Sequence, residues 1–500
     1  MSRLGAWVDE RMDLTGVRKS LLDRPVPDNL TWWHTLGSAT LAVFMVQVVT
    51  GVVLAMYYSP SPDHAHESIR YLERAIASGA TVRGIHHWGA SAMVVLAVAH
   101  MIRVFTMGAY KYPREANWVL GVGLLFIVLA FSFTGYLLPW DQKAYWATAV
   151  GTNIAGTTPI IGGKLVTLLR GGSQQGAATL TRFYSVHVLL LPILLVTIVG
   201  LHLFLVIRQG VAPRSAQLEQ GAPSRTSNAE YPEFYRGRVR DSKKGGLRFW
   251  PDIIAKDIIV GTLVVAILVL LGTFSGAGLE PPADPTDSAY VPRPEWYFLP
   301  FFQLLKLVPG SWESAVAVGL PMVLVLVLLL LPFFDKRSTR SITKRPAAAF
   351  ALGGIAIATA VLLGASMRDE PTNVPAPEVG RILTSTERAG RTQFERQQCG
   401  GCHKVAGMAA VPKKEDAPDA PDLTEVGLRH STAWLHSYIE DPVRFHPDSK
   451  MPAYGPPTLS HQEIEELARY LSSLRGRAQL NKQPQFNDTF PEPLKAKETK

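Results

Sequence analysis

Residues 83–103 read RGIHHWGASAMVVLAVAHMIR, and this stretch decides the fold of the whole chain. It is apolar and long enough to cross a membrane as an α-helix, yet it contains three histidines. Ionisable side chains are costly inside a lipid bilayer and usually belong to a functional site. A second apolar stretch, residues 184–208, contains two more histidines. The two stretches together predict a site that is built from imidazoles within a membrane.

The spacing of these histidines predicts two pairs. His86 and His100 are 14 residues apart, which leaves them about 40° apart around a helix and roughly 21 Å apart along it. His187 and His202 are 15 residues apart, which gives about 60° and a similar rise. His87 would lie about 140° from His100, so His86 fits the pair better. We expect two haems, each held by one histidine from either helix. Histidines that only pack helices together are the alternative, and they leave the matched spacing unexplained.

Glycines recur at the same 14-residue interval on two further apolar stretches. A flat macrocycle needs close approach of the helix backbone, which glycine permits, although small residues also pack membrane helices without any cofactor. Arg83 and Arg103 flank the histidine-bearing stretch and are candidates to pair with haem propionates. The alternative is that they only extend to the membrane surface. The four glycines are Gly37, Gly51, Gly121 and Gly135.

Near the C-terminus, Cys399-Gly-Gly-Cys402-His403 has the spacing of a covalent haem attachment motif. We expect thioethers from the two cysteines and the first axial bond from His403. Met451 is the expected second ligand, because a thioether raises the potential of haem iron. Met408 lies only five residues beyond His403, which is too near to reach the opposite face of the ring. A zinc site is the alternative, but it needs two further ligands, for which the candidates are His430, His436 and His446.

A small helical domain is expected around this motif. Two helices, at about 384–398 and 460–475, should cross with Phe394 and Tyr470 near their contact. The carbonyl of Pro421 is a candidate to orient His403. Both cysteines of the chain belong to the motif, so haem attachment leaves none for a disulfide.

Seven segments are long and apolar enough to span a membrane. Lysine and arginine gather in two connections between them, with eight in residues 209–254 and five in residues 335–346. Because basic loops stay on the cytoplasmic side, the N-terminus is expected there and everything after residue 367 outside, where haem is attached covalently. Nucleic-acid binding is disfavoured because the basic clusters alternate with spans, and no cleavable signal peptide is expected. The segments are about 33–57, 84–107, 116–138, 184–208, 255–275, 314–334 and 347–367.

These observations predict an all-α fold, with a seven-helix transmembrane haem-binding bundle followed by a small soluble helical domain. A segment with three prolines should be a linker, and the last residues are polar, with little apolar content to order them. The expected parts are a four-helix, two-haem domain (1–208), a basic cytoplasmic loop (209–254), three further helices (255–367), the linker (368–383), the soluble domain (384–476) and a polar tail (477–500).

Several motifs resemble those of the cytochrome b subunit of quinol-oxidising cytochrome bc complexes, over about residues 30–367. The likeness is greatest to the split form of photosynthetic membranes, in which a four-helix cytochrome b accompanies a three-helix subunit; here the two parts are joined. The 15-residue histidine step also resembles that form, whereas the mitochondrial type uses 14. Residues 384–476 resemble a class I mono-haem cytochrome c. The motifs are RGIH (83–86), GYLLPW (135–140), TRFYSVH (181–187) and PEWY (294–297).

The resemblance implies two non-covalent haems b and one covalent haem c. His86 and His187 would bind the iron nearer the outside, and His100 and His202 the iron nearer the cytoplasm. The split form carries a further haem, bonded to a cysteine near the start of its first helix, where this chain has Thr35. Because the membrane part contains no cysteine, no third covalent haem is expected there.

The resemblance also implies two quinone sites. At the outer one Glu295 would accept a proton from quinol, with Tyr136 in the same pocket and residues 157–170 as its wall; a simply solvated loop carboxylate is the alternative. Lys256 and Asp257 match a Lys-Asp pair of the quinone-reducing site in mitochondrial-type relatives. A carboxylate that is merely favoured by the helix dipole is an equally good interpretation of Asp257.

The expected function is therefore quinol oxidation with proton translocation, a Q-cycle, by a homodimeric core in a bacterial cytoplasmic membrane. A Rieske iron–sulfur protein is expected as partner, because the chain has no cysteine left for such a cluster. A further cytochrome or a soluble carrier would accept the electrons. A passive di-haem anchor for a soluble dehydrogenase or reductase is the alternative, and it would lack a pocket around Glu295. A transporter with a tethered cytochrome sensor leaves the histidine spacing unexplained.

Overall fold

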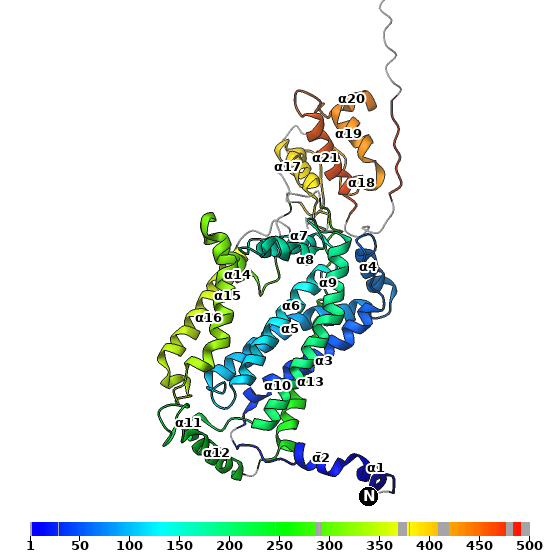
Figure 1. The fold of residues 1–500 in the computed structure, drawn as a ribbon. Coiled ribbons are helices and arrows are strands. Elements are labelled where there is room, and N and C mark those ends of the chain that lie inside the picture. Colours follow the sequence, from blue (N-terminus) through cyan, green and yellow to red (C-terminus); the bar gives the residue numbers. More distant parts are fainter. Residues whose placement is uncertain are drawn as a thin grey trace, which may run out of the picture. The chain divides into compact units, whose positions relative to one another are not determined.

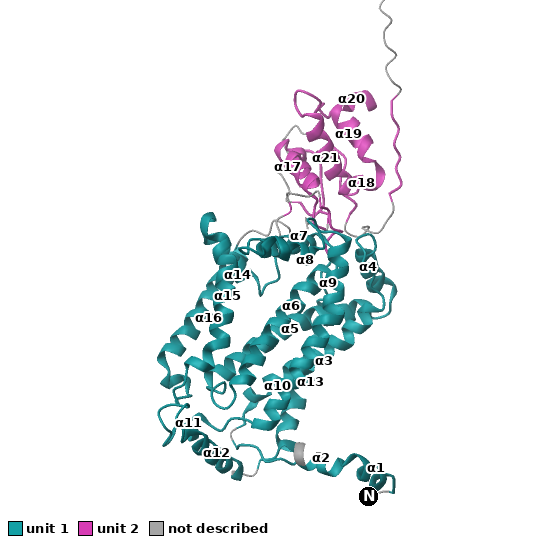
Figure 2. Ribbon diagram, viewed as in Figure 1, with its two compact units in different colours: residues 1–279, 293–369 teal, residues 280–292, 370–500 magenta. Residues whose placement is uncertain are grey.

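The regular structure of this chain is helical. The computed structural model describes residues 3–28, 30–245, 247–285, 290, 293–368, 378–379, 381–408, 420–476 and 484–491. Among these residues, extended backbone pairs only in two isolated bridges, Pro25 with Arg248 and Arg225 with Arg337. The chain divides into two compact units, residues 1–279 with 293–369 and residues 280–292 with 370–500 (Figure 2). The all-α fold predicted from the sequence is confirmed.

In the described part of the chain, seven helices are long and apolar enough to cross a membrane. All of them belong to the first unit, drawn in teal in Figure 2, and Figure 1 labels their helical elements. Each overlaps one predicted segment, so the predicted spans are confirmed. Several begin earlier than predicted, because polar first turns such as Gly79–Arg83 give no hydropathy signal. The spans are Trp32–Ala55 (the 3-10 turn η1, Trp32–Thr35, and α3, Leu36–Ala55), Gly79–Thr106 (α5), Glu115–Leu137 (α6), Ala177–Gln209 (α9, Ala177–Ser185, η2, Val186–Leu190, and α10, Leu191–Gln209), Phe249–Phe274 (η4, Phe249–Ile253, and α13, Ile254–Phe274), Gly310–Phe334 (α15) and Pro346–Arg368 (α16).

Shorter helices flank and connect the spans. One of them, α8, lies within residues 157–170, where short surface helices are expected. In the first unit they are α1 (Arg3–Met12), α2 (Leu14–Leu21), α4 (Ala65–Ala75), α7 (Gln142–Gly156), α8 (Gly162–Arg170), α11 (Ser215–Glu219), α12 (Tyr231–Ser242), α14 (Leu299–Leu307) and the 3-10 turns η3 (Lys243–Gly245) and η5 (Ile342–Lys344).

Helices α5 and α13 touch through two glycines, although they lie far apart in the sequence. A Cβ added at Gly84 would lie 2.4 Å from the carbonyl oxygen of Gly272, so no larger residue fits at this crossing. Val43, Met93 and Leu268, from α3, α5 and α13, form one buried cluster. The first helix of the predicted three-helix part is thus packed into the predicted four-helix part.

The second unit is built on the crossing of α17 (Ser385–Arg396) and α21 (His461–Ser473). The ring centroids of Phe394 and Tyr470 are 5.7 Å apart at the crossing, so the predicted contact is confirmed. Both helices begin with a capping box, in which side chain and backbone bond reciprocally. The other helices of the unit are η6 (Cys399–Gly401), α18 (Val426–Arg429), α19 (Thr432–Glu440) and α20 (Pro442–Phe445).

The segments on either side of this unit differ in part from the expected linker and tail. Val379 and Leu383, inside the predicted linker, are buried in the core of the unit, while its three prolines lie outside the described residues. Residues 484–491 of the predicted tail run along α18 and α19, where Asn487 donates its backbone N–H to Arg429 (2.9 Å) and Trp434 its ring N–H to Thr489 (3.1 Å). Hydrogen bonds, with one aromatic contact between Phe490 and Phe445, hold this stretch. Residues 477–483 and 492–500 lie outside the described residues.

A buried network of basic side chains joins the connection between α5 and α6 to the connection between α15 and α16. The Lys111 ammonium is fully buried and donates to Asp335 Oδ1 (2.8 Å) and to the carbonyl of Thr339 (2.7 Å). Arg340, also fully buried, donates to the carbonyl oxygens of Gly108 (2.7 Å) and Tyr112 (2.8 Å). Some of the basic residues in these connections therefore hold the protein together rather than face solvent.

The charges of this network set each other's protonation. Burial lowers the pKa of Lys111 to about 8. Burial would raise the pKa of Asp335, but hydrogen bonds from Lys111 and Tyr110 outweigh it and keep that pKa below its usual value. Both groups are therefore charged at neutral pH, and the carboxylate compensates a buried ammonium.

Replacing Asp335 should destabilise the membrane unit. Asp335→Asn leaves the Lys111 charge buried without its counter-ion, which costs about 3–5 kcal/mol. The measurement is the thermal unfolding midpoint of the purified protein in detergent. Asp241→Asn is the matched control, because its ion pair with Lys244 is exposed and contributes little. Equal midpoints for the two variants would contradict this role of Asp335.

Candidate functional site

The four membrane histidines meet in two facing pairs. The ring centroids of His86 and His187 are 6.4 Å apart with an interplanar angle of 69°. Those of His100 and His202 are 6.5 Å apart at 71°. The structure therefore brings together the four residues that the spacing singled out, in the pairing that the family resemblance implies.

A π-helical turn explains how a 15-residue step matches a 14-residue step. His187 lies in η2, a π-helical turn that joins α9 to α10. A π turn takes up one extra residue, so the rotation between His187 and His202 is closer to about 40° than to the 60° of a regular helix. The sequence calculation assumed a regular helix and missed this turn.

The distance between the paired rings fits an iron ion between them. A metal–imidazole bond is about 2 Å long, and two such bonds with half of each ring span roughly 6 Å. Among the described residues, no hydrogen bond joins the two rings of either pair. Two imidazoles that face each other without bonding are suited to hold a common ligand.

Two threonines orient the first pair. Thr50 Oγ1 lies 2.9 Å from His86 Nδ1, and Thr134 Oγ1 lies 3.1 Å from His187 Nδ1. Each hydroxyl already donates to a backbone carbonyl of its own helix, at 2.7 Å for Thr50 and 2.8 Å for Thr134. The imidazole Nδ1–H is therefore the donor, which leaves the Nε2 lone pair of each ring free to bind a metal. The sequence interpretation overlooked both threonines, although Thr-Gly occurs at 50–51 and again at 134–135.

Each of the four predicted glycines faces one of the four imidazoles. On α3, a Cβ at Gly37 would lie 3.1 Å from His100 Cε1, and a Cβ at Gly51 would lie 3.3 Å from His86 Cε1. The glycines of α6 occupy the equivalent places. A Cβ would lie 2.6 Å from His187 Cε1 at Gly135 and 3.6 Å from His202 Cε1 at Gly121. A Cβ at Gly135 would displace the His187 ring, one at Gly37 or Gly51 would crowd the ring it faces, and one at Gly121 would make only an ordinary contact.

The two arginines have different surroundings. Arg83 forms an ion pair with Glu73 and donates to the carbonyl oxygens of Ala277 (2.9 Å) and Gly278 (2.7 Å). Arg103 keeps a buried Nε without a hydrogen-bond partner among the described residues. An orphaned guanidinium N–H beside His100 suits a bound carboxylate such as a propionate, whereas Arg83 is engaged by the protein itself.

Glu295 and Tyr136 lie on either side of one lysine. Lys143 Nζ is 2.9 Å from Glu295 Oε1 and 5.4 Å from the centroid of the Tyr136 ring. Tyr136 donates its hydroxyl to the carbonyl of Arg293 (3.3 Å), two residues before Glu295. The predicted pair is therefore brought together, through Lys143, which the sequence interpretation did not consider. The only sequence signal for Lys143 is its place in DQK (141–143), directly after the GYLLPW motif.

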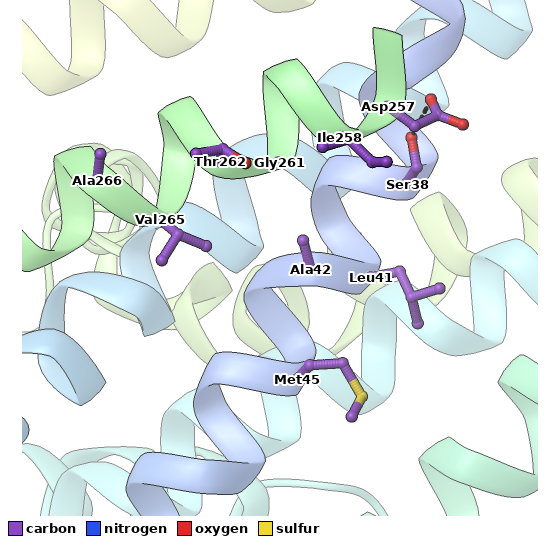
Figure 3. Close-up of a pocket in the computed structure, with 10 residues that line it drawn as sticks. All are labelled: Ser38, Leu41, Ala42, Met45, Asp257, Ile258, Gly261, Thr262, Val265 and Ala266. Carbon is purple, nitrogen blue, oxygen red and sulfur yellow. Dashed lines mark hydrogen bonds between the residues drawn. The ribbon is translucent and has the colours of Figure 1, made fainter. Parts of the chain in front are cut away.

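A groove of about 680 Å³ runs between α3 and α13. Figure 3 shows Ser38 and Asp257 pointing toward one another at one end of it, with apolar side chains such as Met45 along the rest. Ser38 donates its hydroxyl to Asp257 Oδ1 at 2.6 Å. Lys256 does not line the groove and donates instead to the carbonyl of Leu30 (3.0 Å). The structure therefore separates the two residues of the predicted Lys-Asp pair.

In the second unit the attachment motif sits at the end of α17. His403 Nδ1 lies 2.9 Å from the carbonyl oxygen of Pro421, the predicted contact, and this leaves Nε2 free as a ligand. Burial raises the pKa of the Cys399 thiol to about 11. Met451 packs against the core, while Met408 accepts a hydrogen bond from the Tyr470 hydroxyl (3.2 Å). Among the described residues, no group of three or more His, Cys, Asp or Glu side chains is placed to hold a metal.

Family models match most of the chain in order. "Cytochrome b/b6/petB" matches residues 21–210, "Cytochrome b(C-terminal)/b6/petD" residues 282–386 and "Cytochrome c" residues 387–475. The menaquinol:cytochrome c reductase cytochrome b subunit of Bacillus subtilis is 44% identical over 220 residues, which are 98% of that protein and 42% of this chain. This chain belongs to the cytochrome b family. A cytochrome c domain is fused to its C-terminal side.

Other relatives agree with this assignment. Cytochrome b6 of Heliobacterium mobile is 39% identical over 98% of its length and 41% of this chain. Cytochrome b/c1 of Bradyrhizobium diazoefficiens is 32% identical over 52% of its length and 76% of this chain. A solved structure titled "Hyperthermophilic respiratory Complex III" is similar with a TM-score of 0.62 and 27% identity, over 91% of that chain and 72% of this one. The chain is a multi-pass membrane protein of electron transport; the family implies haems b, and Cys399 and Cys402 in a cytochrome c domain indicate a covalent haem c.

A methyl group at Gly135 should weaken haem binding. In Gly135→Ala the new Cβ would lie 2.6 Å from His187 Cε1, so the ring must move out of its pair. We expect the ratio of haem b to haem c in a pyridine haemochrome assay to fall by about half, because one of two imidazole pairs is lost. Gly123→Ala on the same helix is the control, since nothing lies within 4 Å of its Cβ. An unchanged ratio in Gly135→Ala would refute the role of this glycine.

Proposed function

We propose that this chain is the cytochrome b and cytochrome c core of a quinol:cytochrome c-type oxidoreductase that works by a Q-cycle. The observation that carries the proposal is the facing of two imidazole pairs in the membrane bundle, together with the contacts that Glu295 and Tyr136 make with Lys143. The similarity to a menaquinol:cytochrome c reductase subunit and to a respiratory Complex III chain supports it.

The proposed cofactors are two haems b and one haem c. His86 with His187 and His100 with His202 would hold the irons of the haems b, with the four facing glycines making room and Arg103 available to a propionate. In the second unit the haem c would be held by Cys399, Cys402, His403 and Met451. When bound, these haems supply one-electron carriers, two within the membrane and one in the soluble unit.

At the quinol pocket the residues of this chain handle protons. A hydroquinone that is oxidised releases two protons, and the Glu295 carboxylate is placed to accept one of them from a hydroxyl. Tyr136, on α6, forms the neighbouring wall through its contact with Lys143. Glu295 is only 16% exposed, so a proton it accepts is first held away from bulk water.

The groove between α3 and α13 is the proposed place of quinone reduction. A quinone that takes up two electrons needs two protons, and Asp257 with Ser38 forms a polar end to an otherwise apolar groove. An apolar groove with a few polar groups is typical of sites for small apolar ligands. Lys256 would act only indirectly, because its ammonium is bound to Leu30 outside the groove.

The orientation and the assembly complete the proposal. The basic connections of residues 209–254 and 335–346 favour a cytoplasmic N-terminus and a cytochrome c domain on the outer side of a bacterial cytoplasmic membrane. We propose a homodimeric core in contact with lipid, a quinol or quinone as the small partner and a further cytochrome or soluble carrier as the electron acceptor.

A Rieske iron–sulfur protein is proposed as the partner that takes the first electron of quinol. The chain has two cysteines, both in the attachment motif, so an iron–sulfur cluster requires another subunit. A purified complex that oxidises quinol should show a Rieske-type electron paramagnetic resonance signal. Full activity without that signal would contradict this partner.

Removing the carboxylate of Glu295 tests the proposed function. Glu295→Gln keeps the size of the side chain but cannot accept a proton, so quinol oxidation should slow by a factor on the order of 10². The measurement is quinol-dependent reduction of cytochrome c by the purified complex. Glu313→Gln, an exposed glutamate of α15, is the control. A passive electron-transfer anchor predicts unchanged rates in both variants.

A further inference from the structure

Lys143 is placed by the start of α7. The Asp141 side chain caps this helix by accepting the N–H of Ala144 at 2.8 Å, and Lys143 is the second residue of the helix. The cap fixes the backbone from which the lysine side chain extends. The backbone position of Lys143 is therefore set by local structure, and its side chain extends from there to the ion pair.

Three segments meet at this one ammonium. Lys143 itself comes from α7, Tyr136 from α6, and Glu295 from the segment that precedes α14. The tyrosine hydroxyl closes the ring of contacts by donating to Arg293, on the same segment as Glu295. The segment that carries Glu295 is thus held by α6, in which the GYLLPW motif begins, and by α7, which follows the motif.

The burial of the pair makes it stronger than a surface ion pair. The side chains of Lys143 and Glu295 are 33% and 16% exposed. Exposed lysine–carboxylate pairs contribute little, because water screens them and both side chains lose freedom. A pair with most of its surface excluded from water restrains the position of the carboxylate more firmly.

We propose that Lys143 is a positioning residue for quinol oxidation, which holds the Glu295 carboxylate beside Tyr136 until the glutamate accepts the quinol proton. The inference rests on the proposed function. As the proton transfers, the quinol O–H bond breaks and a carboxyl O–H bond forms on Glu295. The neutral acid no longer attracts the ammonium, so the glutamate side chain is released and can carry the proton away.

A double-mutant cycle tests this coupling. Quinol oxidation is measured on the purified complex with the original chain, Lys143→Met, Glu295→Gln and both changes together. We expect Lys143→Met alone to lower kcat about tenfold with little change in KM. The substitution leaves the carboxylate wrongly oriented, while the binding site of the quinol is unchanged. In the double variant the rate should equal that of Glu295→Gln alone, since the lysine has nothing left to position.

Charge and shape are separated by further variants. Lys143→Arg keeps a cation within reach of Glu295 and should retain the rate within about threefold, whereas Lys143→Gln, which keeps only a hydrogen-bond donor, should behave like Lys143→Met. Lys244→Met is the matched control, because it removes a lysine from an exposed ion pair with Asp241 and should leave the rate unchanged. Haem content of every variant, read from its spectrum, separates a change of rate from a failure to fold.

The outcomes distinguish this inference from the function on which it rests. Two outcomes would overturn the positioning role alone. One is a slow Glu295→Gln variant combined with an additive loss of rate in the double variant. The other is a Lys143→Arg variant that is as slow as Lys143→Met. A fast Glu295→Gln would overturn the proposed function and the positioning role with it. If Lys143→Met loses its haem, the comparison of Lys143→Arg with Lys143→Gln in folded complex decides the question.

Discussion

The structure of the membrane unit depends on imidazoles that face each other in pairs where lipid-embedded proteins normally tolerate only apolar side chains. A polar ring at this depth is costly unless its nitrogens find partners. In the pair formed by His86 and His187, one nitrogen of each ring bonds to a threonine and the other is turned toward the opposite ring. Two other helices of the bundle, α3 and α6, supply the threonines and the glycines that permit this.

The same arrangement connects the bundle to its pockets. Glycine 135, which makes room for His187, opens the GYLLPW motif, and Tyr136 follows it directly. The α6 helix therefore carries, at adjacent positions, a glycine that faces an imidazole and a tyrosine that contacts Lys143. At another place, α3 carries Gly37 toward His100 and Ser38 toward Asp257 in the same way. Each of these two helices links one histidine to one candidate quinone pocket through adjacent residues.

Much of this architecture could be predicted from the sequence, because its signals are long or periodic. Seven apolar segments are strong signals, and histidines and glycines at 14-residue intervals reveal shared faces. Contacts between distant segments carry no such period. Nothing in the local sequence distinguishes Lys143 from a solvated lysine, or the buried Arg340 from the other basic residues of its connection. The docking of residues 484–491 depends on scattered hydrogen bonds and one aromatic contact, which composition does not reveal.

The wide turn at His187 has a consequence for how such helices change over evolutionary time. An insertion of one codon into an ordinary membrane helix rotates everything beyond it by about 100° and would carry His202 away from its partner. Because the extra residue is taken up within η2, His187 and His202 at the two ends of this helix still face their partner histidines. Chains whose fourth span differs by one residue between its histidines can therefore preserve one and the same inter-ring geometry.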